Sequence, residues 1–448
     1  MKAICKDNIS YEKQLIEKGL DEFLMMENAG VELANFIKKK SKKIHNAKIL
    51  FLLGTGGNGA DGLVAIRHLK KASAYVLAYK KSTMFLKQEQ ILQNIGFEFL
   101  QEEPCFEDFD IIVDCVFGSG LNKALDEKLQ GIIQKISQSK AIKIACDIPS
   151  GLGQDVCFKA DYTLCMGVVK EKLLEDFAKE FVGKIKIAHL GLKIQAQSTS
   201  GFLLERKDLK LIQKKCSFNK GDLGHVYIFA NKSAGTLAGL GALEFGSGLV
   251  SLVAKESFSP LLMLKDTIES KINAAAIGMG LNDLSILKDE RLQSVPLVLD
   301  ANCFQNADLT LYLNRKDVVL TPHPKEFSML LKLYMNKNIQ VEEIQKKRFF
   351  YVKEFSKQFE CVLVLKGANP IIAQKDKLFV VNCGNEALAK AGSGDVLSGM
   401  IAALLGAKFS ALEAAKNAVL AHALVAKDYK KNKNSFDALK LIKGLKCL

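Results

Sequence analysis

The sequence predicts an α/β protein of two domains, each with a mostly parallel sheet flanked by helices. Short apolar runs of strand length alternate with segments of helical periodicity along the chain, which is the pattern of such sheets. Glycine-rich or polar loops follow many of these runs, as in doubly wound folds. The 448 residues exceed one ordinary core, and the small polar run 195–201 has the composition of a linker. We therefore predict domains at residues 1–200 and 201–448.

Composition narrows the functional classes. Apolar residues make up 48% of the chain and charged residues 25%, as in soluble globular proteins, and no apolar run reaches membrane length. Without a signal-peptide core at the start of the sequence, we expect a cytoplasmic protein with no membrane partner. The net charge of +14 favours anionic ligands. Because the basic residues form no stripe interleaved with aromatic residues, we expect phosphorylated small molecules and no nucleic acid.

The eleven cysteines contain no CxxC pair and no regular spacing, which argues against a disulfide framework or a zinc site. Cys115, Cys146 and Cys361 lie inside apolar strand-like runs. We expect these three side chains to be buried free thiols.

The first half of the chain begins with helical periodicity from Leu15 to Ile37, where Asn28 is a candidate ligand contact or a solvated residue. An apolar strand at 48–53 then leads into the glycine loop Gly54–Gly62 and a further helix. Strand, glycine loop and helix form the phosphate-binding unit of doubly wound folds. The loop lacks the Gly-Lys-Ser/Thr ending of a Walker motif, so its ligand stays open at this point.

Polar residues follow three of the predicted strands in this half. We expect further strands at 110–114, 141–146, 161–166 and 184–189. Asn58, Asp114, Asp147 and Ser150 come at or just after strand ends, which meet at one edge of a parallel sheet. One such carboxylate is commonly a cap, but convergence from three strands favours a site. Oxygen ligands of this kind also suit a hard cation.

The stretch Ala391–Gly399, reading AGSGDVLSG, is the strongest signal in the second half. Its glycines allow close approach of the backbone to a ligand, and the amides of the helix that it opens suit phosphate. Asp395 either caps this helix or takes a proton from a hydroxyl that attacks the phosphate.

Ligand-type loops follow the other predicted strands of this half, which is expected to form a second parallel α/β layer. The strands are expected at 226–229, 249–253, 274–277, 297–299, 318–320 and 362–365, with a small-residue helix at Ala234–Gly248. The loops are Gly278–Gly280, Asp300–Asn302, Thr321–Pro324 and Lys366–Asn369. His323, held between two prolines, suits contact with a ligand ring or a structural role, and Lys366 suits phosphate or solvent.

The stretches MENAG, GTGGNGADGL, FGSGL and DIPSGL, in this order, resemble the N-terminal epimerase domain of the NAD(P)H-hydrate repair enzymes, a Rossmann-like fold. The resemblance implies potassium on Asn58, Asp114 and Ser150, and Asp147 as the acid–base group. It also implies contacts of the hydrated nicotinamide nucleotide with Gly57, Asn58, Gly59, Ala60, Asp61, Gly118, Ser119, Gly120, Leu121, Asn122, Lys123, Ala124 and Asp147. Where that family usually has Asn-Asn-Gly-Gly-Asp, this chain has Gly57 and Ala60 at the first and fourth positions.

KGDLGH, TPHPKE, the Lys366-Gly turn and AGSGDVLSG resemble the ADP/ATP-dependent NAD(P)H-hydrate dehydratase domain, a ribokinase-like fold. The implied substrate contacts are Ala238, Gly280, His323 and Asp395. The implied nucleotide contacts are Lys366, Gly367, Ala368, Asn369, Pro370 and Gly394. Lys325 stands where that family usually has glycine, and the start of the small-residue helix also departs from its pattern.

Together the two resemblances imply a bifunctional isomerase and lyase that repairs hydrated NADH and NADPH. It would interconvert the R and S epimers and dehydrate the S form with ADP, giving AMP and phosphate. Potassium and magnesium are the expected ions, and we expect a homo-oligomer. A small-molecule kinase and a non-catalytic N-terminal binding module are the alternatives. The residues alone decide neither ADP against ATP nor NADH hydrate against NADPH hydrate.

Overall fold

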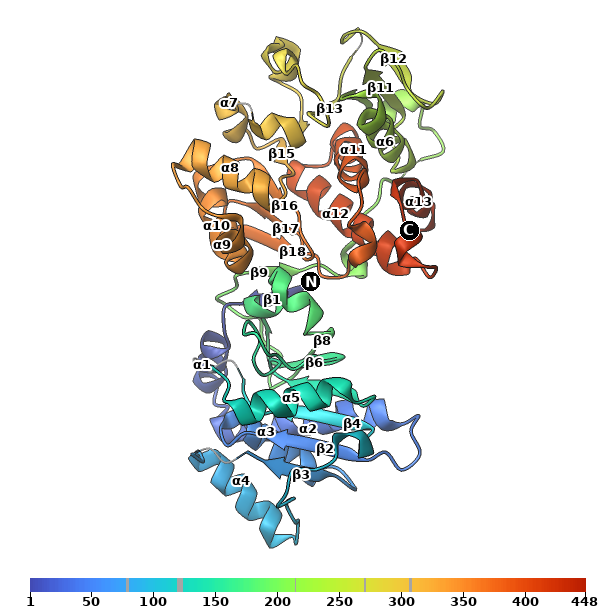
Figure 1. The fold of residues 1–448 in the computed structure, drawn as a ribbon. Helices are drawn as coiled ribbons and strands as arrows, with labels where there is room; N and C mark the ends of the chain where they lie inside the picture. Colours follow the sequence, from blue (N-terminus) through green and yellow to red (C-terminus); the bar gives the residue numbers. More distant parts are fainter. Residues whose placement is uncertain (78–79, 119–123, 214, 270, 306–307) are drawn as a thin grey trace. The chain divides into compact units, whose positions relative to one another are not determined.

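The computed structural model describes residues 1–77, 80–118, 124–213, 215–269, 271–305 and 308–448 (Figure 1). The chain divides into two compact units, one of residues Lys2–Ser200 and one of residues Gly201–Leu448 with Met1. Each unit has its own α/β sheet and its own hydrophobic core. The predicted fold class is confirmed.

The N-terminal unit contains a six-stranded parallel sheet. The strand order is β3 (Ser73–Val76), β2 (Ile49–Leu53), β4 (Ile111–Cys115), β5 (Ile142–Cys146), β6 (Tyr162–Met166) and β8 (Lys184–Ala188). In the register of the central pair, Leu52 lies opposite Asp114 and Leu53 opposite Cys115. β2 and β4 therefore end at the same edge of the sheet, and their loops face a common space.

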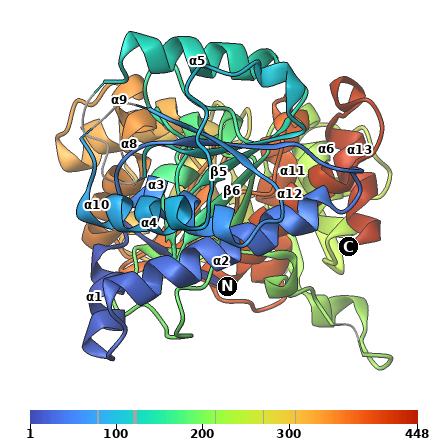
Figure 2. The same cartoon turned by 90° about the horizontal axis from the view of Figure 1, so that it is seen from below.

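Helices cover both faces of this sheet, because alternate strand residues are apolar on both sides. The helix α5 (Glu127–Gln138) packs on the face that carries Leu50 and Ile112. The opposite face, with Phe51 and Val113, packs against α2 (Glu22–Ser41), α3 (Gly57–Arg67) and α4 (Thr83–Asn94). In Figure 2, α5 and α2 lie on opposite sides of β5 and β6.

This unit also contains two short strands, β1 (Lys2–Cys5) and β7 (Val169–Lys170), which pair in parallel. The helix α1 (Ile9–Glu17) follows β1 in the sequence. The helical periodicity from Leu15 to Ile37 predicted one helix, and this is wrong. Gly19 has a φ of +92° and ends α1, and the Asp21 side chain then caps α2 by accepting from the Leu24 N–H. The glycine conformation and the new cap separate the two helices.

The sheet of the C-terminal unit is parallel apart from the single strand β17. Its order is β12 (Met263–Lys265), β11 (Leu249–Val253), β10 (His225–Phe229), β13 (Ala274–Ile277), β14 (Leu297–Leu299), β15 (Val318–Leu320), β16 (Val362–Leu365), β17 (Ile371–Gln374), β18 (Lys377–Val380) and β9 (Gly201–Leu203). β17 pairs antiparallel with both of its neighbours. The predicted strands of this unit are present, while β9, β12 and the β17–β18 hairpin were not predicted.

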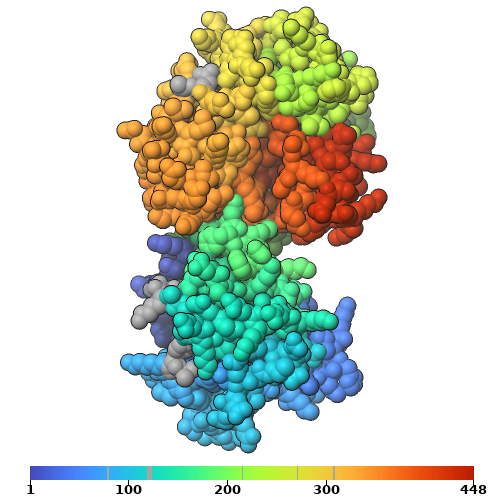
Figure 3. All heavy atoms as spheres, in the orientation of Figure 1, coloured from blue at the N-terminus to red at the C-terminus, as the bar shows by residue number. Residues whose placement is uncertain are grey.

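Helices α6 (Lys232–Glu244), α11 (Ser393–Gly406), α12 (Ala411–Asp428) and α13 (Ala438–Gly444) share a core with one face of this sheet. The remaining helices of the unit are α7 (Thr310–Leu313), α8 (Pro324–Met335), α9 (Val341–Lys346) and α10 (Arg348–Gln358). Figure 3 shows residues of α8–α10 in orange and the C-terminal helices in red on neighbouring parts of one surface. The predicted helix Ala234–Gly248 begins at Lys232 and ends at Glu244, before Gly246 at a φ of +114°.

Candidate active sites

In the N-terminal unit, the glycine loop after β2 brings backbone very close to backbone. A Cβ at Gly59 would lie 1.8 Å from the Gly54 carbonyl oxygen, so only glycine fits there. Gly57 is exposed at the start of α3, and a Cβ there would meet nothing within 4 Å. Ala60, the other departure from the family pattern, is fully buried. Its methyl group therefore packs in the core and does not narrow the binding face.

Asp114 and Ser150 form an oxygen-rich cluster at the edge of this sheet, and Asn58 borders the space at Gly118. The Asp114 carboxylate accepts from the Ser150 amide and hydroxyl, each at 2.7 Å, and from the Val116 amide at 3.1 Å. Burial raises the pKa of Asp114 to about 6, and these hydrogen bonds oppose the rise. Within the described residues, the buried amide oxygen and nitrogen of Asn58 have no hydrogen-bond partner.

Asp147 lies next to this cluster. Its φ of +68° is a left-handed conformation that few non-glycine residues adopt, and such strain is concentrated at functional sites. A Cβ at Gly118 would lie 3.5 Å from Asp147 Oδ2 and 3.7 Å from Asn58 Cβ, so both side chains border the same space. The geometry thus brings together the predicted residues Asn58, Gly118 and Asp147.

Lys170 is a residue of this site that the sequence did not indicate. Its side chain is 1% exposed, its ammonium is paired with Asp147 Oδ1, and it also donates to the Met166 carbonyl at 3.1 Å. The Met166 amide donates to the same Asp147 oxygen at 3.0 Å. Oδ1 is therefore occupied, and Oδ2 is the Asp147 oxygen that borders Gly118. Lys170 comes from the short strand β7, for which no local pattern gave a signal.

Asp61, one turn into α3, adds a second carboxyl group near Asp147. Burial, and then the charges of Asp147 and Glu12, raise the pKa of Asp61 well above its ordinary value, while Lys170 opposes the rise. Of the other predicted contacts, Ala124 is exposed and Ser119, Gly120, Leu121, Asn122 and Lys123 lie outside the described residues.

In the C-terminal unit, the helix α11 begins as the glycine turn predicts. Gly392 has a left-handed φ of +86°, and Ser393 is the first helical residue. The buried His422 Nε2 lies 3.0 Å from both the carbonyl and the hydroxyl oxygen of Ser393. Burial lowers the pKa of His422 to about 4, so at neutral pH an uncharged ring anchors the first turn.

Asp395 lies in that first turn. Burial raises the pKa of Asp395 to about 6, the charge of Asp300 adds to the rise, and Lys366 opposes it. A Cβ at Gly394 would lie 3.6 Å from Lys366 Nζ, so this ammonium is at the start of α11. A carboxyl group, an ammonium and helix amides thus share one site, where they suit a transferring phosphate and its attacking hydroxyl.

Asp300 and Glu326 hold Lys366; Asp300 begins one of the predicted ligand-type loops but was given no role, and Glu326 was not predicted as a site residue. Lys366 Nζ lies 2.9 Å from Asp300 Oδ1 and 3.9 Å from Glu326 Oε2. Burial would lower the pKa of Lys366, but the two carboxylates outweigh burial and raise it. Asp300 directly follows the apolar strand β14. Asp114 was predicted as a site residue because it stands at the end of such a strand, β4.

His323 is the N-cap of α8. Its Nδ1 accepts from the Glu326 amide at 3.2 Å, while Glu326 Oε2 accepts from the His323 amide at 2.8 Å. Burial, followed by the charges of Lys366 and Lys325 among others, lowers the pKa of His323. The unusual lysine at position 325 therefore favours an uncharged imidazole, which leaves the 48% exposed ring able to contact a ligand.

A buried arginine holds the backbone of the predicted nucleotide loop, residues 366–370. Arg348 is fully buried at the start of α10, and its Nη2 donates to the carbonyls of Leu365, Lys366 and Asn369 at 3.2–3.3 Å. The exposed residues of the loop are Gly367 and Ala368. These three hydrogen bonds fix the loop backbone and so the direction of the Lys366 side chain.

Gly280 has a φ of +65° and lies exposed against the N-cap of α6. A Cβ at Gly280 would lie 2.0 Å from Asn231 Nδ2, so a side chain there would displace that cap. Ala238 is not brought to this surface. It is fully buried where α6 meets α11, and a Cβ at Gly399 would lie 1.9 Å from its carbonyl oxygen.

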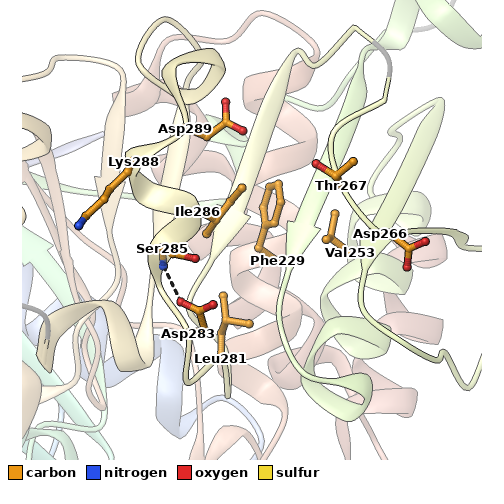
Figure 4. Close-up of a pocket in the computed structure, with 10 residues that line it drawn as sticks. All are labelled: Phe229, Val253, Asp266, Thr267, Leu281, Asp283, Ser285, Ile286, Lys288 and Asp289. Atoms are coloured by element: carbon orange, nitrogen blue, oxygen red, sulfur yellow. Dashed lines mark hydrogen bonds between the residues drawn. The ribbon is translucent and has the colours of Figure 1, made fainter.

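A cavity of about 540 Å³ opens next to Gly280 (Figure 4). It is lined by Phe229, Val253, Asp266, Thr267, Leu281, Asp283, Ser285, Ile286, Lys288 and Asp289. Figure 4 shows Phe229 and Ile286 side by side, while the Lys288 side chain extends away from both. The lining thus combines four apolar side chains with hydroxyl groups, three carboxylates and a lysine.

The described ranges of the chain contain no group of three or more His, Cys, Asp and Glu side chains that could hold a metal. No helix in them combines the length and the apolar character needed to cross a bilayer. Cys115, Cys146 and Cys361 are free and buried, as predicted.

The fold and the two sites define a two-domain α/β enzyme, and comparison with known proteins identifies its family. Residues 22–172 match the family described as YjeF-related protein N-terminus, and residues 231–446 match NAD(P)H-hydrate dehydratase. A bifunctional NAD(P)H-hydrate repair enzyme, Nnr, of Helicobacter pylori is 37% identical over 99% of both chains. The chain belongs to the family of bifunctional NAD(P)H-hydrate repair enzymes. The family and enzyme class predicted from the sequence are confirmed.

Other similar proteins carry related names. The Nnr enzyme of Escherichia coli is 32% identical, with 84% of this chain and 80% of that protein covered. A solved structure from Bacillus subtilis is an ADP/ATP-dependent NAD(P)H-hydrate dehydratase co-crystallised with ATP and Mg²⁺. It is 29% identical, covers 52% of this chain and 92% of its own, and has a TM-score of 0.44.

Proposed function

We propose that residues 201–448 dehydrate the S epimer of hydrated NADH or NADPH with ADP, and that Asp395 is the general base. The observation that carries this proposal is the Asp395 carboxyl group in the first turn of α11, with the Lys366 ammonium beside that turn. A pKa of about 6 keeps Asp395 ionised at neutral pH yet basic enough to accept a proton.

In the proposed reaction, Asp395 removes the proton of the substrate hydroxyl while the hydroxyl oxygen attacks the terminal phosphorus of ADP. The bond to the bridging oxygen breaks and AMP leaves with the bonding electrons. The amides at the start of α11 and Lys366 stabilise the charge on the transferring group. The phosphate ester then leaves as inorganic phosphate, driven by the ring-nitrogen lone pair. Loss of a proton from the neighbouring carbon restores the dihydronicotinamide.

The nucleotide is assigned to the loop Lys366–Pro370 and to Gly394. The fixed backbone of this loop, held by Arg348, supports the assignment. We propose ADP as donor with magnesium on its phosphates. His323, Gly280 and Ala238 are assigned to the nicotinamide side of the substrate. Among them, the exposed positions of His323 and Gly280 support direct contact, while buried Ala238 would act by setting the position of α6.

Residues 1–200 are proposed to interconvert the R and S epimers, with Asp147 as the acid–base group. The strained backbone of Asp147 and its Oδ2 atom bordering Gly118 support this role. The substrate would lie against residues 57–61, 118–124 and Asp147. Lys170 holds the other Asp147 oxygen, so a proton can be exchanged only at Oδ2.

Potassium fits the cluster at the edge of the N-terminal sheet. The buried Asn58 amide, without a partner in the described part of the chain, and the Asp114 carboxylate and Ser150 hydroxyl are donors that a hard monovalent cation accepts. Potassium would supply positive charge beside the substrate when bound. The chain's own contribution is to hold these oxygens next to Asp147 Oδ2.

The proposal extends to the place of action and to assembly. Hydrated NAD(P)H and ADP are metabolites of the cytoplasm, and we place the enzyme there. We also propose that the chain acts as a homo-oligomer.

The decisive experiment incubates the full chain with hydrated NADH and ADP, and follows the absorbance of restored NADH. Asp395→Asn should abolish this signal while epimerisation, followed by chromatography of the R and S forms, continues. The matched control is Asp376→Asn, which changes an exposed aspartate in the turn between β17 and β18 of the same unit. A wild-type chain that restores no NADH, or an Asp395→Asn variant of near-normal rate, would overturn the proposal.

A further inference from the structure

Asp300 connects three segments of the C-terminal unit through one buried carboxylate. It directly follows β14 and is 2% exposed. Its Oδ1 accepts from Lys366 Nζ and from the Ala301 amide, both at 2.9 Å. Its Oδ2 accepts from the Ser398 hydroxyl at 2.7 Å. Ser398 is three residues after Asp395 on α11, so Asp300 links the loop after β16 to the helix of the general base.

The backbone conformation of Ala301 directs its amide to the Asp300 carboxylate. Ala301 has a φ of +48°, a left-handed conformation that alanine rarely adopts. That turn places the Ala301 amide on the carboxylate of the preceding residue. The strain is therefore coupled to the orientation of Asp300, as expected where a local conformation serves a site.

A lysine needs such an anchor if its charge is to be fixed. The Lys366 side chain is flexible, and Glu326 at 3.9 Å offers the ammonium a second carboxylate away from α11. Asp300 at 2.9 Å is the closer partner, and it holds Nζ 3.6 Å from the Cβ position of Gly394. An ion pair buried to this extent adds little net stability on average, so its value lies in placing the charge.

We propose that Asp300 is the positioning residue that aims Lys366 at the transferring phosphate. This inference rests on the proposed dehydratase function and adds to it a residue that acts through Lys366. Ser398 is the second anchor, because it fixes the free end of the Asp300 carboxylate on the same helix as Asp395.

The test compares Asp300→Asn, Lys366→Met and the double variant in the full chain. Asp300→Asn keeps the shape of the side chain and removes its charge, so kcat for dehydration should fall about 10- to 100-fold through misplacement of Lys366. In the Lys366→Met background the same substitution should cost less than about threefold, because its target is gone. Equal costs in both backgrounds would overturn the proposal.

The pH profile separates positioning from a merely structural role. Asp300 raises the pKa of Asp395 and Lys366 lowers it, so Asp300→Asn should move the acidic limb of kcat to lower pH in the Lys366→Met background, where no ammonium is displaced. Ser398→Ala keeps the Asp300–Lys366 pair, and we expect a fall of only a fewfold with the limb unmoved. A loss of rate that follows the folded fraction in thermal unfolding, with an unmoved limb in the double variant relative to Lys366→Met, would contradict the inference. Failure of the wild-type chain to use ADP would instead contradict the proposed function.

Discussion

Asp395→Asn is the substitution that tests the proposed chemistry most directly. Asparagine keeps the size of the side chain but cannot accept the hydroxyl proton. Removal of a general base typically costs about 10²- to 10⁴-fold, so the rate of NADH restoration should fall by at least about 100-fold. Binding of ADP should change little, because the nucleotide contacts are assigned to Lys366–Pro370 and Gly394.

The pH dependence of the wild-type enzyme gives an independent measure of the pKa of Asp395. Burial raises the pKa of Asp395 to about 6, and only the ionised form is a base. At pH 5 about one molecule in ten carries the ionised form, so kcat should be about a tenth of its plateau. The plateau should begin near pH 7, and the limb at about 6 should be absent from the residual activity of Asp395→Asn.

The stability of this variant should change in the opposite direction to its activity. The folded state binds the Asp395 proton more tightly than the unfolded state, where the pKa is near 3.8. The ionised carboxylate therefore costs folding free energy above pH 6, at most about 3 kcal/mol, and nothing below pH 4. We expect Asp395→Asn to melt at higher temperature than the wild type at pH 8 and at a similar temperature at pH 4.

Rates at saturating ADP and melting curves at both pH values are the required measurements, with Asp376→Asn as the control. A variant that retains a tenth or more of the wild-type rate would refute Asp395 as base. A wild-type profile without a limb between pH 5 and 7 would refute the pKa argument.

Three further substitutions or ligand changes test the remaining assignments. Asp114→Ala should weaken the dependence of epimerisation on potassium and slow it, while dehydration stays unchanged; an epimerisation rate independent of potassium in the wild type would contradict the cation site. Lys170→Met should slow epimerisation at least about tenfold, because Asp147 loses the partner that fixes Oδ1; Lys172→Met, at an exposed lysine in the turn after β7, is the control and should be near normal. ATP should be a weaker donor than ADP or compete with it, because the hydroxyl must meet the terminal phosphate in line; faster turnover with ATP, giving ADP, would reverse the donor assignment.

Much of the fold was predictable because the central strands are buried on both faces. The runs Ile49–Leu53, Ala274–Ile277 and Val362–Leu365 are apolar throughout, which is the composition of strands buried on both faces. The hairpin β17–β18 and the short strands β1, β7 and β9 escaped prediction. Such elements are held by pairing with a neighbour, and pairing leaves no periodic signal in the strand's own sequence.

The sites were predictable where a polar residue ends an apolar strand or stands in a glycine turn. Asp114 and Asp395 are residues of that kind. Asp300 gave the same signal after β14, but its pairing with Lys366 across 66 positions of sequence depends on the fold. Lys170 gave no local signal, because it resembles any lysine until β7 places it beside Asp147.

The two proposed activities depend on each other for a geometric reason. In-line attack requires the substrate hydroxyl to face both Asp395 and the terminal phosphate, and the ring has only one face on which its hydroxyl can do so. A site rigid enough to hold Lys366 between Asp300 and the first turn of α11 cannot also accept the opposite epimer. That epimer would accumulate as unrepaired cofactor unless it were converted. An epimerase on the same chain converts it, and the acid–base catalysis that we propose for Asp147 needs no nucleotide. Joining the two units therefore gives full repair from one folded chain, with ADP consumed at a single site.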